Sequence, residues 1–282
     1  FFFIAFSFLI KYSKISFDLI IIKKLFLFGL PLIPYFFFDW TYNSGGRFLV
    51  EKYLSLEKVA IFGLSLQFAG IFNLFESALG NALLPHYYET SNSIDGNKRS
   101  GELVLRIILF FGILLNLIYL LINPLFFMVV KDINYYDAIE YVPFLLFVFY
   151  LRGIGNVLRL GLLFSKKTKI ISLIKGCFLL VLLFSSIYLI KKYNNILGVA
   201  FAYLISNFLY IIVMFIFSNK YFRLILNWKK TIFILFYTCI LFYFFINHSL
   251  NNVLFDFLIK VSVLSITSIS IIKIFKFKLN FK

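Results

Sequence analysis

The stretch GLPLIPYFFFDWTYNSGGRFLVEKYLSLEKVAIFGLSLQFAGIFNLFESALGNALLPHYYET, residues 29–90, decides the fold. It predicts two membrane-spanning helices joined by a short charged connection. Pro31 and Pro34 open the first helix, which holds one carboxylate, Asp39. The second helix carries polar side chains in an otherwise apolar run: Gln67, Asn73, Glu76 and Asn81. Polar groups are costly in hydrocarbon and usually mark function, so a functional site is expected in this helix pair.

The composition of the whole chain indicates a membrane protein. Of its 282 residues, 62% are hydrophobic, and the mean hydropathy is +0.96, whereas soluble domains contain roughly 45–50% apolar residues. The net charge of +16 would suggest a nucleic-acid partner in a soluble protein. Here Lys and Arg lie mainly between the apolar runs, so topology and anionic lipid headgroups explain them, and no nucleic acid is expected.

Long apolar runs predict an all-α, polytopic bundle, because a helix needs about 20 apolar residues to cross a bilayer. The runs are apolar on all sides and exceed the ~10-residue alternating segments of a membrane barrel. The ten residues FFFIAFSFLI are too short to span, so residues 1–24 are interpreted as the remnant of a preceding membrane helix with a cytoplasmic linker. The eight predicted spans are residues 25–44, 59–84, 103–130, 138–164, 170–190, 196–217, 231–246 and 253–272.

The distribution of basic residues predicts the orientation of these spans. Nineteen of the 28 Lys and Arg residues, Lys175 included, are assigned to one alternate set of connections and six to the other. Since basic residues favour the cytoplasmic side, this bias places residues 11–24, the connection 88–101 and the C-terminus in the cytoplasm.

The sequence does not indicate an enzyme. The longest polar connection, residues 89–101, has the length of an ordinary connector. The chain holds no phosphate-binding glycine motif, no zinc-protease motif and no paired Cys–His spacing. Neither a catalytic residue, a cofactor nor a metal site is expected.

One face of the fourth predicted span is cationic. Arg152, Asn156 and Arg159 lie at i, i+4 and i+7. Two guanidinium groups on one intramembrane face suit a pyrophosphate-bearing ligand, because Arg offers bidentate donors to phosphate. The alternatives are pairing with Glu76 or Glu140, or snorkelling to headgroups, which is a strong rival for Arg159.

The acidic positions allow two interpretations each. Asp39 is either a cavity-facing group that responds to protons or cations, or the partner of Arg47. Asn73 and Glu76 lie at i, i+3, and their stripe faces a wet cavity in the favoured interpretation or makes an interhelical hydrogen bond in the other. In the last span, Asp256 and Lys260 at i, i+4 predict a self-neutralising pair.

Several weak motifs follow one another in residues 29–89. They are a GLP-x-x-P opening, the element Gly46–Arg47–Phe48, the run LEKVAIF at residues 56–62, and an exit with Pro85 and Tyr87. In their order and spacing this stretch, about a fifth of the chain, resembles the start of the second lobe of polysaccharide-unit flippases. These flippases belong to the multidrug/oligosaccharidyl-lipid/polysaccharide exporter superfamily.

The resemblance implies a fold of two six-helix bundles around a cavity, with two extra helices at the end. Residues 1–24 would then contain the tail of the sixth helix. Residues 25–218 would form the second bundle, and residues 219–282 the two extra helices and a basic tail.

The resemblance also implies a function: translocation of undecaprenyl-pyrophosphate-linked oligosaccharide units across the bacterial plasma membrane. A polysaccharide polymerase, other assembly proteins and membrane lipids would be its partners. We expect Arg47, Arg152 and Arg159 to meet the charged headgroup, and Asp39 and Glu76 to couple ions or protons. The amides expected to meet sugar hydroxyls are Gln67, Asn73, Asn81 and Asn156. A cation-coupled drug or metabolite exporter and an inactive truncated fragment remain alternatives.

Overall fold

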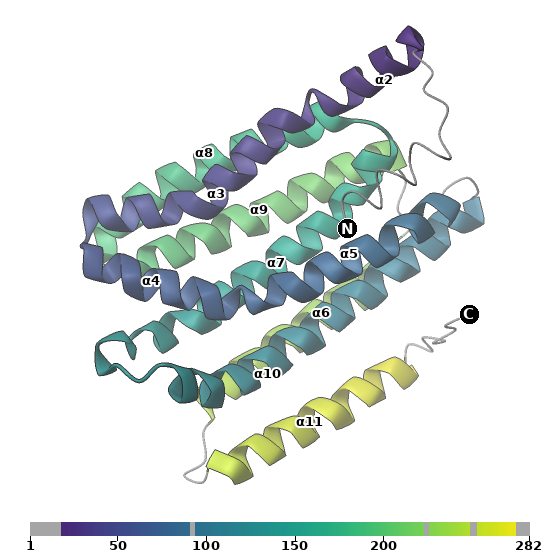
Figure 1. The fold of residues 1–282 in the computed structure, drawn as a ribbon. Helices are drawn as coiled ribbons and strands as arrows, with labels where there is room; N and C mark the ends of the chain where they lie inside the picture. Colours follow the sequence, from purple (N-terminus) through teal and green to yellow (C-terminus); the bar gives the residue numbers. More distant parts are fainter. Residues whose placement is uncertain (1–17, 91–93, 223–225, 249–252, 275–282) are drawn as a thin grey trace, which may run out of the picture.

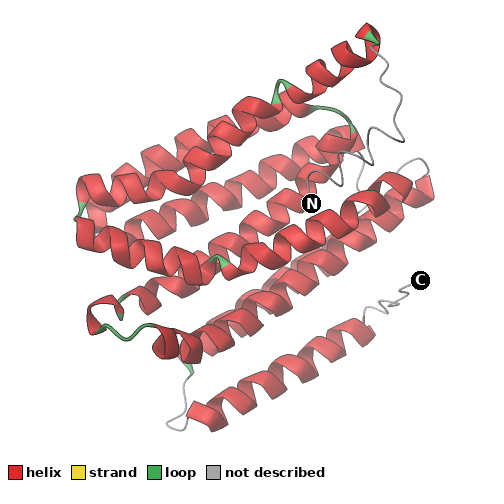
Figure 2. Ribbon diagram, viewed as in Figure 1, coloured by secondary structure: helices red, strands yellow, loops and turns green. Residues whose placement is uncertain are grey.

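The computed structural model of the chain describes residues 18–90, 94–222, 226–248 and 253–274. This part is built from helices without a strand, as Figure 2 shows, and the predicted all-α class is confirmed. The expected helix remnant falls mostly in residues 1–17, which lie outside the described residues. The helices of Figure 1 are α2 (Leu19–Gly29), α3 (Leu32–Tyr53), α4 (Leu56–Ala69), α5 (Ile71–Thr90), α6 (Ile94–Val129), the short 3-10 helix η1 (Ile133–Tyr135), α7 (Ala138–Phe164), α8 (Thr168–Tyr193), α9 (Ile196–Phe222), α10 (Trp228–Asn247) and α11 (Val253–Ile274).

Within the described residues, eight helical segments are long and apolar enough to cross a membrane, in agreement with the predicted bundle. The first span joins α2 and α3, and the second joins α4 to most of α5. The other six spans lie one each in α6 to α11, with η1 included in the span of α7. The chain is therefore a multi-pass membrane protein.

Several helix ends differ from the predicted ones. Helix α2 begins at Leu19 rather than near residue 25, because the Asp18 carboxylate accepts a hydrogen bond from the Ile20 amide at 2.8 Å and caps the helix. The expected connection 89–101 is mostly helical, since α5 ends at Thr90 and α6 begins at Ile94. The expected boundaries at residues 25 and 218 thus fall inside α2 and α9.

Two breaks divide the first two spans. Leu30 and Pro31 separate α2 from α3. Pro31 and Pro34 have no amide hydrogen to donate to the carbonyls of Leu27 and Leu30, so the helical hydrogen bonds are interrupted here. Between α4 and α5, a Cβ on Gly70 would lie 2.8 Å from the Leu66 carbonyl oxygen. Only glycine fits this break without a shift of the backbone.

Helix α7 lies at the centre of the bundle. It packs against α4, α5, α6, α8 and α9, and most of its side chains are buried. Gly153 and Gly155 allow this close packing, because a Cβ on Gly153 would lie 3.0 Å from Phe111 of α6, and one on Gly155 would lie 2.6 Å from Tyr210 of α9.

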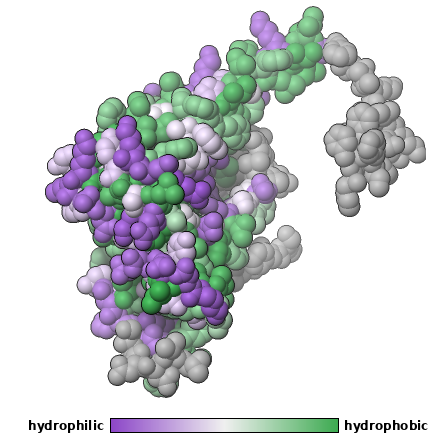
Figure 3. Space-filling model, turned by 60° about the vertical axis from the view of Figure 1, so that its left-hand side comes forward, coloured by the Kyte–Doolittle hydropathy of each residue, from purple (hydrophilic) through white to green (hydrophobic). Residues whose placement is uncertain are grey.

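The last two helices lie at the edge of the bundle. Helices α10 and α11 both pack against α6 (Figure 1), and Leu120, Leu241, Phe245 and Leu264 form a small core of their own there. Large apolar side chains such as Phe36, Trp40, Phe184 and Tyr243 are exposed. Figure 3 shows hydrophobic surface along the helices and hydrophilic surface gathered at the end where α3 turns into α4. The apolar exterior suits a lipid environment.

The packing of α7 against α9 predicts the effect of a single methyl group. Gly155→Ala should destabilise the protein by about 1–3 kcal/mol, because the buried Tyr210 ring has to move. Thermal unfolding in detergent micelles measures this change. Gly80→Ala is the matched control, because a Cβ on Gly80 meets nothing within 4 Å. Equal unfolding midpoints for the two variants would contradict the packing argument.

Candidate functional site

Side chains from five helices line a cavity of about 270 Å³. Four of the predicted site residues meet in it: Arg47 from α3, Gln67 from α4, Asn73 from α5 and Arg152 from α7. The remaining lining residues are Tyr42, Asn43, Leu66, Leu145, Val148, Phe149 and Tyr203. The cavity thus combines two guanidinium groups and three amides with an apolar wall.

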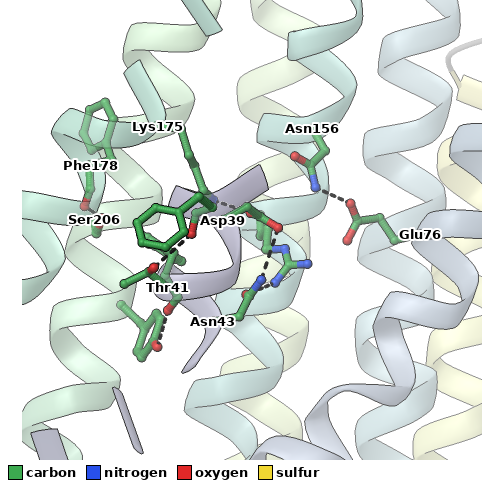
Figure 4. Close-up of polar contacts among 12 residues, drawn as sticks. Asp39, Thr41, Asn43, Glu76, Asn156, Lys175, Phe178 and Ser206 are labelled. Carbon is green, nitrogen blue, oxygen red and sulfur yellow. Dashed lines mark hydrogen bonds and ion pairs between the residues drawn. The ribbon is translucent and has the colours of Figure 1, made fainter. Parts of the chain in front are cut away.

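Asp39 is paired with a residue that the sequence assigns to a cytoplasmic connection. Lys175 lies inside α8, is 5% exposed, and places its Nζ 2.7 Å from Oδ1 of Asp39. Figure 4 shows the two side chains pointing toward each other from α8 and α3. Of the two interpretations of Asp39, pairing with Arg47 is therefore wrong, because Lys175 is the partner. Counting Lys175 with a connection is wrong as well, since it lies within α8 and within the predicted span 170–190.

The ion pair continues into the cavity. The Asn43 side-chain amide donates to Oδ2 of Asp39 at 3.2 Å, and Arg152 donates to Oδ1 of Asn43. A continuous polar chain thus leads from Lys175 through Asp39 and Asn43 to Arg152, across α8, α3 and α7. Figure 4 labels the first three of these residues.

The polar face of α7 divides its contacts between two neighbours. Asn156 donates to Oε1 of Glu76 on α5, which gives Glu76 an interhelical hydrogen bond. The Arg159 guanidinium lies over the Tyr35 ring of α3 at 4.9 Å from its centre. Neither these residues nor the exposed Asn81 lines the cavity.

Tyr203 of α9 fixes the α3 wall of the cavity and is absent from the sequence-predicted site. Its hydroxyl donates to the Tyr42 carbonyl at 2.7 Å and accepts from the Gly46 amide at 3.3 Å. A Cβ on Gly46 would lie 2.8 Å from the Tyr203 ring. Glycine at position 46 therefore admits the ring, which gives the Gly46–Arg47 element a structural reason.

A second, larger cavity adjoins the first. Its volume is about 550 Å³, and it shares Arg47 and Gln67 with the first cavity. Lys131, Asp132 and Tyr135, near and within η1, contribute to its lining. Arg47 and Gln67 therefore border both spaces.

The predicted pair in the last span is confirmed. Nζ of Lys260 lies 2.8 Å from Oδ2 of Asp256 and also donates to the Phe245 carbonyl at 3.2 Å. This pair sits at the α6–α11 edge, apart from the cavity of Arg47 and Arg152.

Comparisons with protein-family models, with curated proteins and with solved structures find no match for this chain. The functional assignment therefore depends on the geometry of the cavity and on the resemblance of residues 29–89.

The cavity predicts a difference between exposure to water and exposure to lipid. With Cys177 and Cys239 replaced by Ser, Gln67→Cys should react with a charged, membrane-impermeant thiosulfonate at least tenfold faster than Phe37→Cys. The Phe37 side chain is 62% exposed but lies on the apolar exterior, where a thiol stays un-ionised and unreactive. Mass spectrometry of protein in nanodiscs measures the reaction, and equal rates would contradict a wet cavity.

Proposed function

We propose that this chain takes part in flipping undecaprenyl-pyrophosphate-linked oligosaccharides across the bacterial plasma membrane. The observation that carries the proposal is the convergence of Arg47 and Arg152 with amide groups in one cavity within the membrane-spanning bundle. The unequal distribution of Lys and Arg between the two sets of connections supports a cytoplasmic C-terminus. A polysaccharide polymerase and other assembly proteins are the proposed partners.

The main physical difficulty of such a reaction is to move the charged headgroup through the hydrocarbon of the membrane. A pyrophosphate with several sugars has to pass about 30 Å of hydrocarbon, where a bare charge is very costly. Guanidinium groups replace water around the phosphates through paired N–H donors. Gln67, Asn73 and Asn43 line the same cavity and offer donors and acceptors to sugar hydroxyls.

The contacts of the two carboxylates refine their proposed roles. Both oxygens of Asp39 have partners, Oδ1 with Lys175 and Oδ2 with Asn43, so an incoming cation has to displace Lys175 there. Glu76 bonds the neutral Asn156 and is the residue that we propose for coupling protons or cations to the transport cycle.

A cation-coupled drug or metabolite exporter of the same superfamily is the second candidate. Such a protein needs acidic groups exposed to its cationic substrate. The carboxylate of Asp39 is instead neutralised by Lys175, and the first cavity is lined by Arg47 and Arg152. This arrangement favours an anionic ligand. An inactive fragment is the third candidate, and the ligand-binding assay described next separates it from the first candidate.

The proposal predicts the effect of removing each guanidinium. Arg47→Ala and Arg152→Ala should each weaken binding of undecaprenyl pyrophosphate in phosphatidylcholine nanodiscs at least tenfold, because each loses charge-assisted hydrogen bonds to phosphate. In cells, surface polysaccharide should fall with them. Arg159→Ala should have a smaller effect, because Arg159 stacks on Tyr35 outside the cavity.

Lys192→Ala is the matched control, because it removes one positive charge from an exposed position at the end of α8. Unchanged binding in Arg47→Ala and Arg152→Ala, or equal loss in the Lys192→Ala control, would overturn the proposal. Absence of binding by the unaltered chain would favour the inactive fragment.

A further inference from the structure

Lys175 is a buried cation that the proposed transport reaction does not use. It is 5% exposed and does not line the cavity of Arg47 and Arg152. Its ammonium group lies 2.7 Å from the Asp39 carboxylate, 4.1 Å from the centre of the Tyr42 ring and 5.5 Å from that of Tyr210. A charge held this deep needs a partner, because desolvation is costly.

The Asp39 carboxylate, which links Lys175 to the cavity residue Asn43, interacts with both of these residues. Oδ1 of Asp39 meets Lys175, and Oδ2 accepts from Asn43, whose own oxygen accepts from Arg152. The side-chain amide of Asn43 thus bonds to both Asp39 and Arg152. Arginine and carboxylate form strong bidentate pairs, so Asp39 would compete with any anionic ligand for Arg152 if it lacked a cation of its own.

We propose that Lys175 is a positioning residue that keeps Arg152 available to an anionic ligand by neutralising Asp39. This inference rests on the proposed function, since it assumes that Arg152 meets phosphate. Without Lys175, the Asp39 carboxylate captures the Arg152 guanidinium, or that of Arg159, which stacks on Tyr35 one turn earlier on α3. Either capture removes cationic character from the α7 face.

The charge balance of the site identifies the ligand class. Asp39 and Lys175 cancel each other, so the cationic charge lining the first cavity is that of Arg47 and Arg152. Two guanidinium groups that line one cavity match a group with at least two negative charges in close proximity, and a pyrophosphate meets this requirement. Lys175 thus sets the affinity for the ligand without touching it.

The test uses the full chain in phosphatidylcholine nanodiscs with inorganic pyrophosphate as the probe. Lys175→Met should weaken pyrophosphate binding at least tenfold, toward the level of Arg152→Ala. The double variant Asp39→Asn/Lys175→Met should recover binding to within about threefold of the unaltered chain, because an amide does not capture Arg152. Lys175→Arg should keep binding, since it preserves the positive charge beside Asp39.

Thermal unfolding of each variant separates positioning from stability. The double variant removes the buried Lys175 charge together with its half-buried partner Asp39 and is expected to fold. Lys175→Gln replaces Lys175→Met if Lys175→Met does not fold. Binding that stays normal in Lys175→Met while Arg152→Ala loses it would overturn the inference and leave the proposed function standing. Failure of the folded double variant to recover binding would also overturn the inference. Normal binding in Arg152→Ala would instead overturn the proposed function.

Discussion

A carboxylate inside a membrane bundle needs a cation, and the structure around Asp39 depends on how that need is met. Lys175 supplies the charge from α8 at 2.7 Å, so the ion pair joins two helices that the sequence separates by more than a hundred residues. Helix α8 in turn packs on α9, whose Tyr203 holds the backbone of α3 through Tyr42 and Gly46. The α3 wall of the cavity is therefore fixed at three successive turns. These contacts hold the part of α3 that carries Asn43 and Arg47 into the lining of the first cavity, and Arg47 also borders the second.

Helix α7 combines two demands that conflict in an ordinary membrane helix. Its glycines at 153 and 155 let α6 and α9 approach closely, while Arg152 and Asn156 reach α3 and α5 through hydrogen bonds. Gly153 and Gly155 lie on nearly opposite sides of the helix, and Arg152 and Asn156 lie on the face between them. Helix α7 therefore packs closely on two sides and keeps a polar face between these contacts. Charged groups are costly in hydrocarbon, and each of these polar contacts reduces that cost.

The sequence predicts the features that depend on periodicity and composition. Run length and hydropathy predict the eight spans, and the i, i+4, i+7 spacing predicts a shared face for Arg152, Asn156 and Arg159. Periodicity does not say which helix stands opposite a given face. Sequence reasoning therefore misses the partner of Asp39. It also misses Tyr203, because Tyr203 acts through a hydrogen bond with Gly46, which lies 157 residues earlier in the chain. Sequence reasoning assigns Lys175 to a connection because a single Lys near the start of an apolar run is typical of a membrane boundary. In the structure, Lys175 is buried against α3, where it lies over the Tyr42 ring.

The sign of the charge in the cavity separates the proposed transport of an anion from the export of a cation, and it depends on pairing rather than on residue counts. Asp39, Glu76, Arg47, Arg152 and Arg159 all lie in or beside the same site, and their sum alone is ambiguous because both signs are present. Pairing resolves the ambiguity: Lys175 neutralises Asp39, and Glu76 is turned toward Asn156, whereas Arg47 and Arg152 border the open volume. The Coulomb energy between two charges is larger in a low-dielectric site than in water, so a cation in the first cavity is opposed by the guanidinium groups of Arg47 and Arg152. Under the proposed function, this charge favours a phosphorylated headgroup over a cationic drug.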